Sequence, residues 1–290
     1  MKIKFKAYVF SSQLTAFFEY GKMFLGDVMK EMICFDIDGT LRDNLKHDVS
    51  FSTLEALKKL KGNGYRIVIA TGRGKDSLMK TGIMDIIDWD GYVCNNGQIV
   101  MDSLKHTIYH ATMKKEAVKE VLRVADENNM VTCIKAKKRK LNKEADEYAL
   151  TSLKYFNNPL PEVGKYEGEE VDAMIVYGPL KHTYDEYKHI EGICVLPGES
   201  TYADITIANV SKATGIKKLL ELYSLKEYIA FGDSLNDMFM FKEAKYSIAM
   251  GQGNETLKKQ ATYVTTDIDH HGIYNGCVHF GLIEGGKYGV

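Results

Sequence analysis

The sequence lacks the cysteine pattern of secreted or zinc-binding domains. Its 290 residues include only five cysteines, an odd number without any C-x-x-C spacing. This argues against both a disulfide framework and a structural zinc site, and a reducing, cytoplasmic compartment fits best. The five are Cys34, Cys94, Cys133, Cys194 and Cys277.

Long apolar runs and an excess charge of one sign are also lacking. Residues 2–31 mix apolar and aromatic side chains with Lys and Glu, so we expect neither a membrane span nor a signal peptide there. Lys and Arg number 38 against 39 for Asp and Glu, a formal net charge of -1. The whole chain therefore has no electrostatic footprint for nucleic acid, and any phosphate-bearing ligand must be held locally.

What is present is an ordinary globular composition, 45% hydrophobic and 27% charged, at a length suited to two domains. Apolar runs at residues 32–36, 65–70 and 91–94 predict buried strands. A helix lies between the first two, and its start is predicted from the capping-box spacing of Ser52 and Glu55. Strand, helix and strand in this order predict an α/β fold with a Rossmann-like parallel sheet.

After Gly97 the pattern changes to a hairpin, an amphipathic helix and further strands near residues 130–135, 171–177 and 192–196. The α/β rhythm resumes with a helix at 211–223. We therefore predict a core formed by residues 32–110 and 197–290, with residues 111–196 inserted as an α+β domain. Residues 1–31 form an amino-terminal extension of uncertain status in this scheme, and Met29 is a natural start.

Acidic residues follow two of the expected strands. Asp36 and Asp38, in FDIDGT, stand two apart where a strand ends, so both side chains can face one cleft. Taken alone, this segment fits a solvated turn equally well. A second acidic group, Asp233 and Asp237 in GDSLND, follows another apolar strand. Two carboxylates about 4 Å apart, as expected for Asp36 and Asp38, repel by about 4 kcal/mol at a dielectric of ~20, so that pair implies a hard cation, most plausibly Mg²⁺.

Two further placements suit phosphate chemistry. Thr71 follows a strand and lies beside Gly72 in a turn, where its hydroxyl and the backbone N–H groups can bind an oxyanion. Lys212 begins a helix and can supply a compact positive charge. Each residue alone is weak evidence for phosphate binding, but the four placements together occur in an order that chance rarely produces.

In these four segments the chain resembles the haloacid dehalogenase superfamily of phosphohydrolases, and within it the Cof-type subgroup. FDIDGT, ATGR, Lys212 and GDSLND correspond to the four motifs, and the insertion lies where that subgroup carries its cap domain. The resemblance runs from about Met32 to the carboxyl end. It implies a Rossmann-like core with an inserted α+β cap.

The resemblance also implies roles for the matching positions. Asp36 is the nucleophile that forms an aspartyl-phosphate, and Asp38 is the general acid and base whose backbone carbonyl helps to hold Mg²⁺. Thr71 and Lys212 bind the transferring phosphoryl group. Metal ligation is implied for Asp233, and Asp237 supports the metal, its waters or the phosphate, as does Asn236.

Other positions leave alternatives open. Asn96 matches a turn that touches substrate in the family, although an ordinary turn fits nearly as well, and Arg73 suits substrate binding or a structural salt bridge. Gln252 stands where the subgroup commonly has Asn, which puts a ligand role there in doubt. The basic run at 135–140, KAKKRK, is usually a solvated loop, although in a cap it could screen or bind an anionic substrate.

We therefore predict a Mg²⁺-dependent phosphatase for a small phosphorylated metabolite, with sugar phosphates ahead of phosphorylated cofactors as the substrate class. A phosphomutase and a non-catalytic phosphometabolite-binding protein are the alternatives. We expect neither a nucleic-acid partner nor a membrane partner. The physiological substrate and the oligomeric state stay unknown from sequence.

Overall fold

The computed structural model describes residues 30–156, 158–198, 200–286 and 288. The expected amino-terminal extension therefore lies outside the described residues, apart from Lys30 and Glu31. Contacts between Cα atoms divide the chain into two units. Among the described residues, the first comprises residues 30–69, 83–90, 220–286 and 288, and the second comprises residues 70–82 and 91–219 without 157 and 199.

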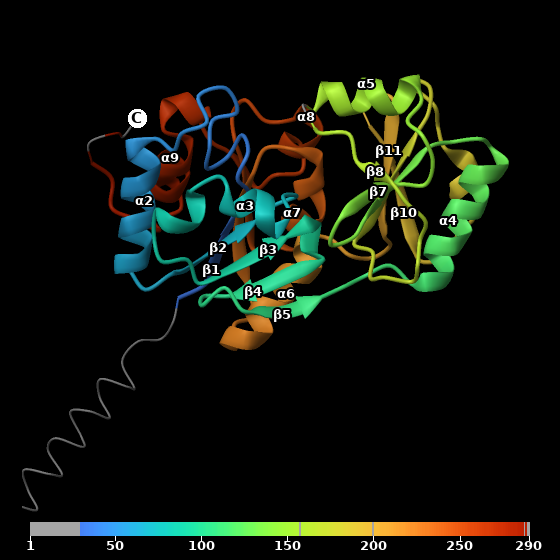
Figure 1. Ribbon diagram of the computed structural model, residues 1–290. Coiled ribbons are helices and arrows are strands. Elements are labelled where there is room, and N and C mark those ends of the chain that lie inside the picture. The colour runs from blue at the N-terminus through green and yellow to red at the C-terminus, as the bar shows by residue number, and fades with distance from the viewer. Residues whose placement is uncertain (1–29, 157, 199, 287, 289–290) are drawn as a thin grey trace, which may run out of the picture. The chain divides into compact units, whose positions relative to one another are not determined.

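The first unit is built on parallel strands in the order β14-β13-β12-β1-β2. All four residues of β1 and all five of β12 are buried, as expected for apolar strands that are covered on both faces. Helices α2 and α9 pack against each other (Figure 1). The strands are β1 (Met32–Phe35), β2 (Arg66–Ala70), β12 (Tyr228–Gly232), β13 (Tyr246–Ala249) and β14 (Tyr263–Val264). The helices are α2 (Phe51–Gly62), α7 (Met238–Glu243), α8 (Glu255–Lys258) and α9 (Gly272–His279), with short 3₁₀ turns at Ile83–Asp85, Leu235–Asp237 and Ile268–His270.

The start of α2 differs from the sequence prediction. Ser50, with extended backbone, is the N-cap, and its hydroxyl accepts a hydrogen bond from the Thr53 amide at 3.3 Å. The predicted cap, Ser52, lies inside the helix and is buried. The prediction was wrong by two residues because two serines precede the same apolar stripe, and only backbone geometry distinguishes them.

The second unit contains an antiparallel meander, β3-β4-β5, and a six-stranded sheet in the order β10-β11-β9-β6-β7-β8. Its strands are β3 (Gly91–Cys94), β4 (Ile99–Asp102), β5 (Thr107–His110), β6 (Thr132–Lys135), β7 (Arg139–Leu141), β8 (Glu162–Val163), β9 (Ala173–Tyr177), β10 (Ile193–Pro197) and β11 (Tyr202–Ile207). Its helices are α3 (Lys75–Met79), α4 (Lys115–Glu127) and α5 (Glu147–Tyr155), while α6 (Lys212–Tyr223) begins in it; 3₁₀ turns lie at Asn95–Gly97 and Asp185–Tyr187.

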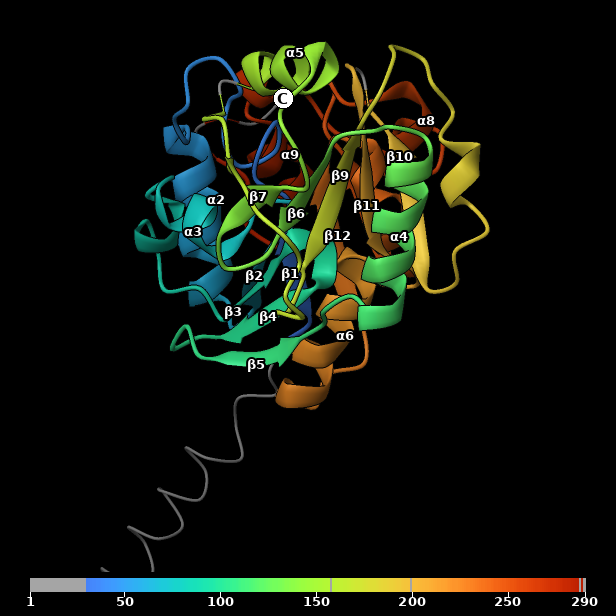
Figure 2. The ribbon, with the colours of Figure 1, turned by 45° about the vertical axis from the view of Figure 1, so that its right-hand side comes forward.

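The two faces of the six-stranded sheet are covered by different helices (Figure 2). Side chains alternate between faces along a strand, so Ile134 packs with Val118 and Val121 of α4, whereas Cys133 packs with Ala149 of α5. Both clusters are buried. The insertion therefore has a hydrophobic core on each side of its sheet.

The six-stranded sheet continues past residue 196. Strand β11 pairs with β10 on one side and with β9 on the other, in antiparallel register. Its alternating side chains leave Ala203 and Ile205 fully buried on the α4 face. We propose that the inserted segment spans residues 111–207, because β11 cannot leave this sheet without exposing those side chains.

The α/β class is confirmed, with a main sheet rich in parallel pairs and a second sheet in the insertion. Among the described residues, the helices are all too short or too polar to cross a membrane.

Buried thiols make the fold sensitive to alkali. Burial raises the pKa of Cys94 to about 12 and raises the pKa values of Cys34 and Cys277 above their ordinary value. Unfolded thiols ionise near pH 8.5, so stabilisation by the neutral buried thiols is complete below that pH and is lost progressively as the pH rises from there to the folded pKa. We expect Cys94 alone to cost about 2 kcal/mol of unfolding free energy at pH 10.

Urea unfolding at pH 7.5 and pH 10 measures this loss. Cys94→Ala should reduce the difference between the two pH values, whereas Cys194→Ala should leave it unchanged, because the Cys194 side chain is exposed. Equal pH dependence in all three proteins contradicts the assignment.

Candidate active site

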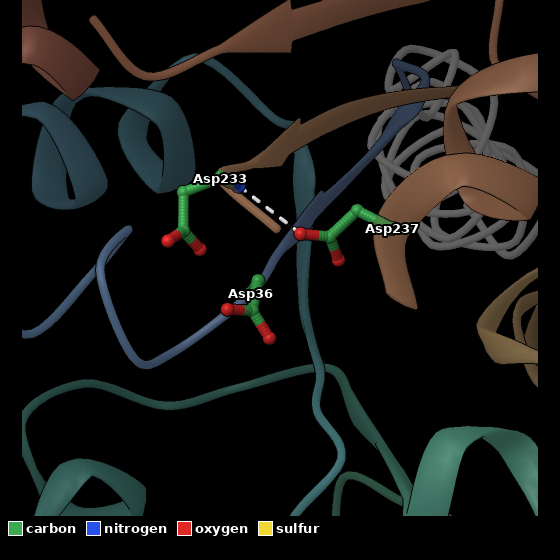
Figure 3. A group of neighbouring side chains, drawn as sticks. All are labelled: Asp36, Asp233 and Asp237. Carbon is green, nitrogen blue, oxygen red and sulfur yellow. Dashed lines mark hydrogen bonds between the residues drawn. The ribbon is translucent and has the colours of Figure 1, made fainter. Parts of the chain in front are cut away.

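Three carboxylates meet beyond the carboxyl ends of two neighbouring strands. Asp36 directly follows β1 and Asp233 directly follows β12, and these strands pair in parallel with Phe35 opposite Phe231. Asp237 comes from the 3₁₀ turn that precedes α7. One oxygen from each carboxylate lies within 4.8 Å of the others (Figure 3). This edge of a parallel sheet is where ligands bind in α/β proteins.

The environment of these carboxylates favours a bound cation. Asp36 is 4% exposed and Asp237 is fully buried. Two negative charges at 4.8 Å repel by about 3 kcal/mol at an effective dielectric of ~20, and burial adds a desolvation cost. An all-oxygen donor set of this kind fits a hard divalent cation.

Glycines allow the carboxylates to approach the backbone so closely. A Cβ atom on Gly39, which has a φ of +81°, would lie 2.2 Å from Oδ2 of Asp233. A Cβ atom on Gly232 would lie 2.6 Å from Oδ2 of Asp237. That Asp237 oxygen accepts hydrogen bonds from the amides of Asp233, at 3.0 Å, and Ser234, at 3.1 Å. Asp237 thus holds the turn that carries Asp233.

Asp38 occupies a different position from the three clustered carboxylates. Its carboxylate lies 3.7 Å from the Arg42 guanidinium and is 36% exposed. Its side chain is not one of the three that meet within 4.8 Å. The sequence prediction gave the metal contact of Asp38 to its backbone carbonyl, and not to this side chain. A partly exposed carboxyl group beside the cluster suits proton transfer. Asn236 is exposed, and its Oδ1 accepts a hydrogen bond from the Ser234 hydroxyl at 2.7 Å.

In the second unit, two turns that carry predicted substrate ligands are joined by hydrogen bonds. The Arg73 amide donates to Oγ1 of Thr71 at 3.1 Å, and the Asn96 amide donates to the Thr71 carbonyl at 3.0 Å. Thr71 is buried, whereas the neighbouring Gly72 is exposed. Gly72, Arg73 and Asn96 all line a pocket of about 500 Å³. The turns after β2 and β3 therefore form one polar surface.

Lys212 is the first residue of α6 and is fully buried. Burying an ammonium group costs free energy unless a negative charge lies near it. The sequence alone does not reveal that Lys212 is buried. The preceding residue, Ser211, packs tightly against Gly97: a Cβ on that glycine would lie 2.0 Å from the Ser211 carbonyl oxygen. The start of α6 is thereby attached to the turn that carries Asn96.

Two residues near the carboxylates were not predicted as functional. The Thr40 hydroxyl, fully buried, donates to Oδ1 of Asp233 at 3.3 Å. The Gln252 side chain donates to the Gly39 carbonyl and accepts from the Ile268 amide at 2.9 Å, so it ties the turn after β1 to a distant loop. Thr40 belongs to FDIDGT, and its position in that segment is the signal that could have identified it. Gln252 was noted in the sequence only as a departure from the Asn that the subgroup commonly has there, and that departure argued against a ligand role.

Comparison with known proteins gives a consistent result. Residues 33–276 match the family of haloacid dehalogenase-like hydrolases. The 5-amino-6-(5-phospho-D-ribitylamino)uracil phosphatase YwtE of Bacillus subtilis is 25% identical over 274 residues, covering 83% of this chain and 94% of that protein.

Two solved structures are similar over most of both chains. BT1666 from Bacteroides thetaiotaomicron, described among phosphatases of the same superfamily, has 28% identity and a TM-score of 0.79, covering 89% of this chain and 97% of its own. BT4131, described as a sugar phosphatase of subclass IIB, has 28% identity and a TM-score of 0.73, covering 88% and 100%. The chain therefore belongs to the haloacid dehalogenase-like hydrolases and is a phosphatase of their cap-bearing Cof-type subgroup.

Proposed function

We propose that this protein is a Mg²⁺-dependent phosphatase that hydrolyses small phosphate monoesters through a phosphorylated Asp36. The observation that carries the proposal is the group of Asp36, Asp233 and Asp237 oxygens within 4.8 Å of one another, in which Asp36 and Asp237 are buried and Asp233 is half-buried. Such a group is stable when a divalent cation compensates its charge. Asp36, Asp233, Asp237 and the backbone carbonyl of Asp38 are the proposed ligands.

Asp36 is the proposed nucleophile. One of its carboxylate oxygens attacks phosphorus, and the bond from phosphorus to the leaving oxygen breaks as Asp38 donates a proton to that oxygen. Asp38 then accepts a proton from a water molecule, whose oxygen attacks phosphorus and releases inorganic phosphate and free Asp36. The partial exposure of Asp38 supports this role, because its proton can exchange with solvent.

Thr71 and Lys212 are the proposed ligands of the transferring phosphoryl group. Thr71 offers a hydroxyl in a turn after β2, and Lys212 offers a positive charge held in a buried position. When bound, Mg²⁺ supplies charge neutralisation for the phosphoryl oxygens. These groups stabilise charge that spreads over the phosphoryl oxygens in the transition state.

The proposed substrates are small phosphorylated metabolites, with sugar phosphates first and phosphorylated cofactors second. The sugar phosphatase BT4131 and the ribitylaminouracil-phosphate phosphatase YwtE support this range. A phosphate-release assay over such compounds tests the function, and release of inorganic phosphate separates a phosphatase from a phosphomutase, which retains the group.

Metal dependence is the most direct test of the carboxylate group. We expect hydrolysis of p-nitrophenyl phosphate with Mg²⁺, its loss in EDTA and its recovery with excess Mg²⁺. Mg²⁺ at 100 times its Kd should stabilise the fold by about 2.7 kcal/mol, seen as a higher Tm. Asp233→Asn should weaken both effects, whereas Asp269→Asn should retain them, because Asp269 is exposed and pairs with Lys46. Undiminished hydrolysis in EDTA contradicts the proposal.

A further inference from the structure

The pocket that holds Arg73 and Asn96 has a second wall formed by the inserted sheet. Its volume of about 500 Å³ lies in the range of small-molecule sites. One wall comes from the turns after β2 and β3, and the other comes from β6, β7, β9, β10 and β11 of the insertion. A ligand whose phosphoryl group is near Thr71 would therefore place its remaining atoms against the insertion.

The inserted wall is an uncovered part of a sheet face. At one end of this face, Tyr177 and Tyr202 pack in the cluster covered by α5. At the other end the same alternation brings Lys135 and Asp204 to the surface, and both line the pocket. Arg139 lies directly opposite Lys135 in the pairing of β6 with β7. The uncovered end is polar and charged, unlike the apolar end beneath α5.

Positive charge predominates around the pocket. Five basic residues line it: Arg73, Lys75, Lys135, Lys137 and Arg139. Only three acidic residues do so, namely Asp76, Asp172 and Asp204. Two of these have cationic or imidazole partners, because Asp204 lies 3.7 Å from Nζ of Lys135 and Asp172 lies 2.7 Å from Nε2 of His110.

The hairpin of β6 and β7 supplies basic side chains that have no acidic partner of this kind. Lys137 and Arg139 are exposed and make no ion pair within the described part of the chain. The hairpin also borders a groove of about 960 Å³ that is lined by four glutamates, Glu162, Glu167, Glu169 and Glu170. There Lys140 pairs with Glu169, whereas Lys137 and Arg139 form no ion pair with any of the four.

We propose that Lys137 and Arg139 select substrates that carry a second anionic group, a carboxylate or a phosphate, remote from the phosphoryl group that is hydrolysed. The inference rests on the proposed phosphatase function and narrows its substrate class. A neutral hydroxyl at this place leaves two cations without a partner, whereas an anionic group accepts charge-assisted hydrogen bonds from them. The basic run noted in the sequence thus forms the part of the pocket that selects substrates by the charge of their second group.

Matched pairs of substrates test the proposal. Glucitol 6-phosphate and 6-phosphogluconate are both open chains and differ by a hydroxymethyl group against a carboxylate at C1, and fructose 6-phosphate differs from fructose 1,6-bisphosphate by a second phosphate. We expect kcat/KM to be about tenfold or more higher for the anionic member of at least one pair, the factor that one charge-assisted hydrogen bond is worth. The pair that responds identifies the second group.

Neutral substitutions test whether Lys137 and Arg139 cause the preference for the anionic substrate. Lys137→Gln combined with Arg139→Gln should lower the ratio of kcat/KM between the anionic and the neutral member to near one, mainly through a higher KM for the anionic member. Lys138→Gln is the matched control, because Lys138 lies in the same hairpin but does not line this pocket. The ratio should be unchanged in that variant.

Calorimetric binding of both members of each pair to Asp36→Asn separates this inference from the proposed function. If no phosphate ester is hydrolysed but the anionic member still binds about tenfold more tightly and the double variant loses that preference, the phosphatase mechanism fails and the anion site stands. If hydrolysis proceeds with equal kcat/KM for both members, or if Lys138→Gln lowers the ratio as much as the double variant, the inference is overturned.

Discussion

Asp36→Asn should reduce hydrolysis of p-nitrophenyl phosphate in the presence of Mg²⁺ by a factor on the order of 10⁴ or more. The substitution keeps the size of a side chain that is 4% exposed. The amide cannot attack phosphorus, and the substitution also removes one of three clustered negative charges. The effect should lie in kcat, since the turns that carry Thr71 and Arg73 are unchanged. Initial rates and a single-turnover measurement detect the loss.

Two control variants show whether the loss is specific to the nucleophile. Asp38→Asn should lose a factor of about 10² to 10⁴, the range for general acid–base catalysis, and should change the pH dependence of the remaining rate. Asp269→Asn should keep the full rate. Circular dichroism and Tm must show that each variant is folded. An Asp36→Asn protein with undiminished metal-dependent hydrolysis would falsify the mechanism.

Gly97→Ala should destabilise the fold by about 3 kcal/mol or more. Gly97 has a φ of +101°, and a Cβ there would lie 2.0 Å from the Ser211 carbonyl oxygen. That oxygen cannot move freely, because it accepts hydrogen bonds from the Gly215 amide at 3.2 Å and the Thr214 hydroxyl at 2.8 Å. The clash should displace the start of α6 and therefore Lys212, so hydrolysis should fall as well.

Gly64→Ala separates steric overlap from backbone strain. Gly64 also has a positive φ, +84°, but a Cβ there meets nothing within 4 Å. It should therefore cost only the left-handed backbone penalty of about 1 kcal/mol and should leave hydrolysis unchanged. Urea unfolding of both variants gives the comparison. Equal destabilisation of the two proteins contradicts a role for the contact between Gly97 and Ser211.

Much of the first unit was predictable because its signals are local. The strand predicted at 32–36 is β1 at 32–35, and the acidic residues of FDIDGT and GDSLND follow β1 and β12 as the motif positions predicted. Apolar runs that end in acidic and glycine residues are typical of parallel strands whose carboxyl ends carry a site. The N-cap of α2 was misplaced because Ser50 and Ser52 offer the same hydroxyl two residues apart.

The insertion was harder to predict, because its elements are defined by long-range pairing. Strand β11 has an alternating pattern of its own, yet only its pairing with β9 and β10 assigns it to the six-stranded sheet. Strand β8 is likewise defined by pairing with β7. Short strands of this kind have weak intrinsic preference, so the neighbouring strand decides their conformation.

The sequence by itself determined the chemical groups of the site, their order along the chain and the α/β class, since these depend on residue type and short-range periodicity. Tertiary structure alone decided which groups meet. It brings Asp36, Asp233 and Asp237 within 4.8 Å, places Thr40 against Asp233 across 193 residues of sequence, and lines a pocket with Lys137 and Arg139. The physical reason is that local pattern sets strand and helix, whereas proximity between distant segments follows from strand pairing and packing, which no single segment encodes.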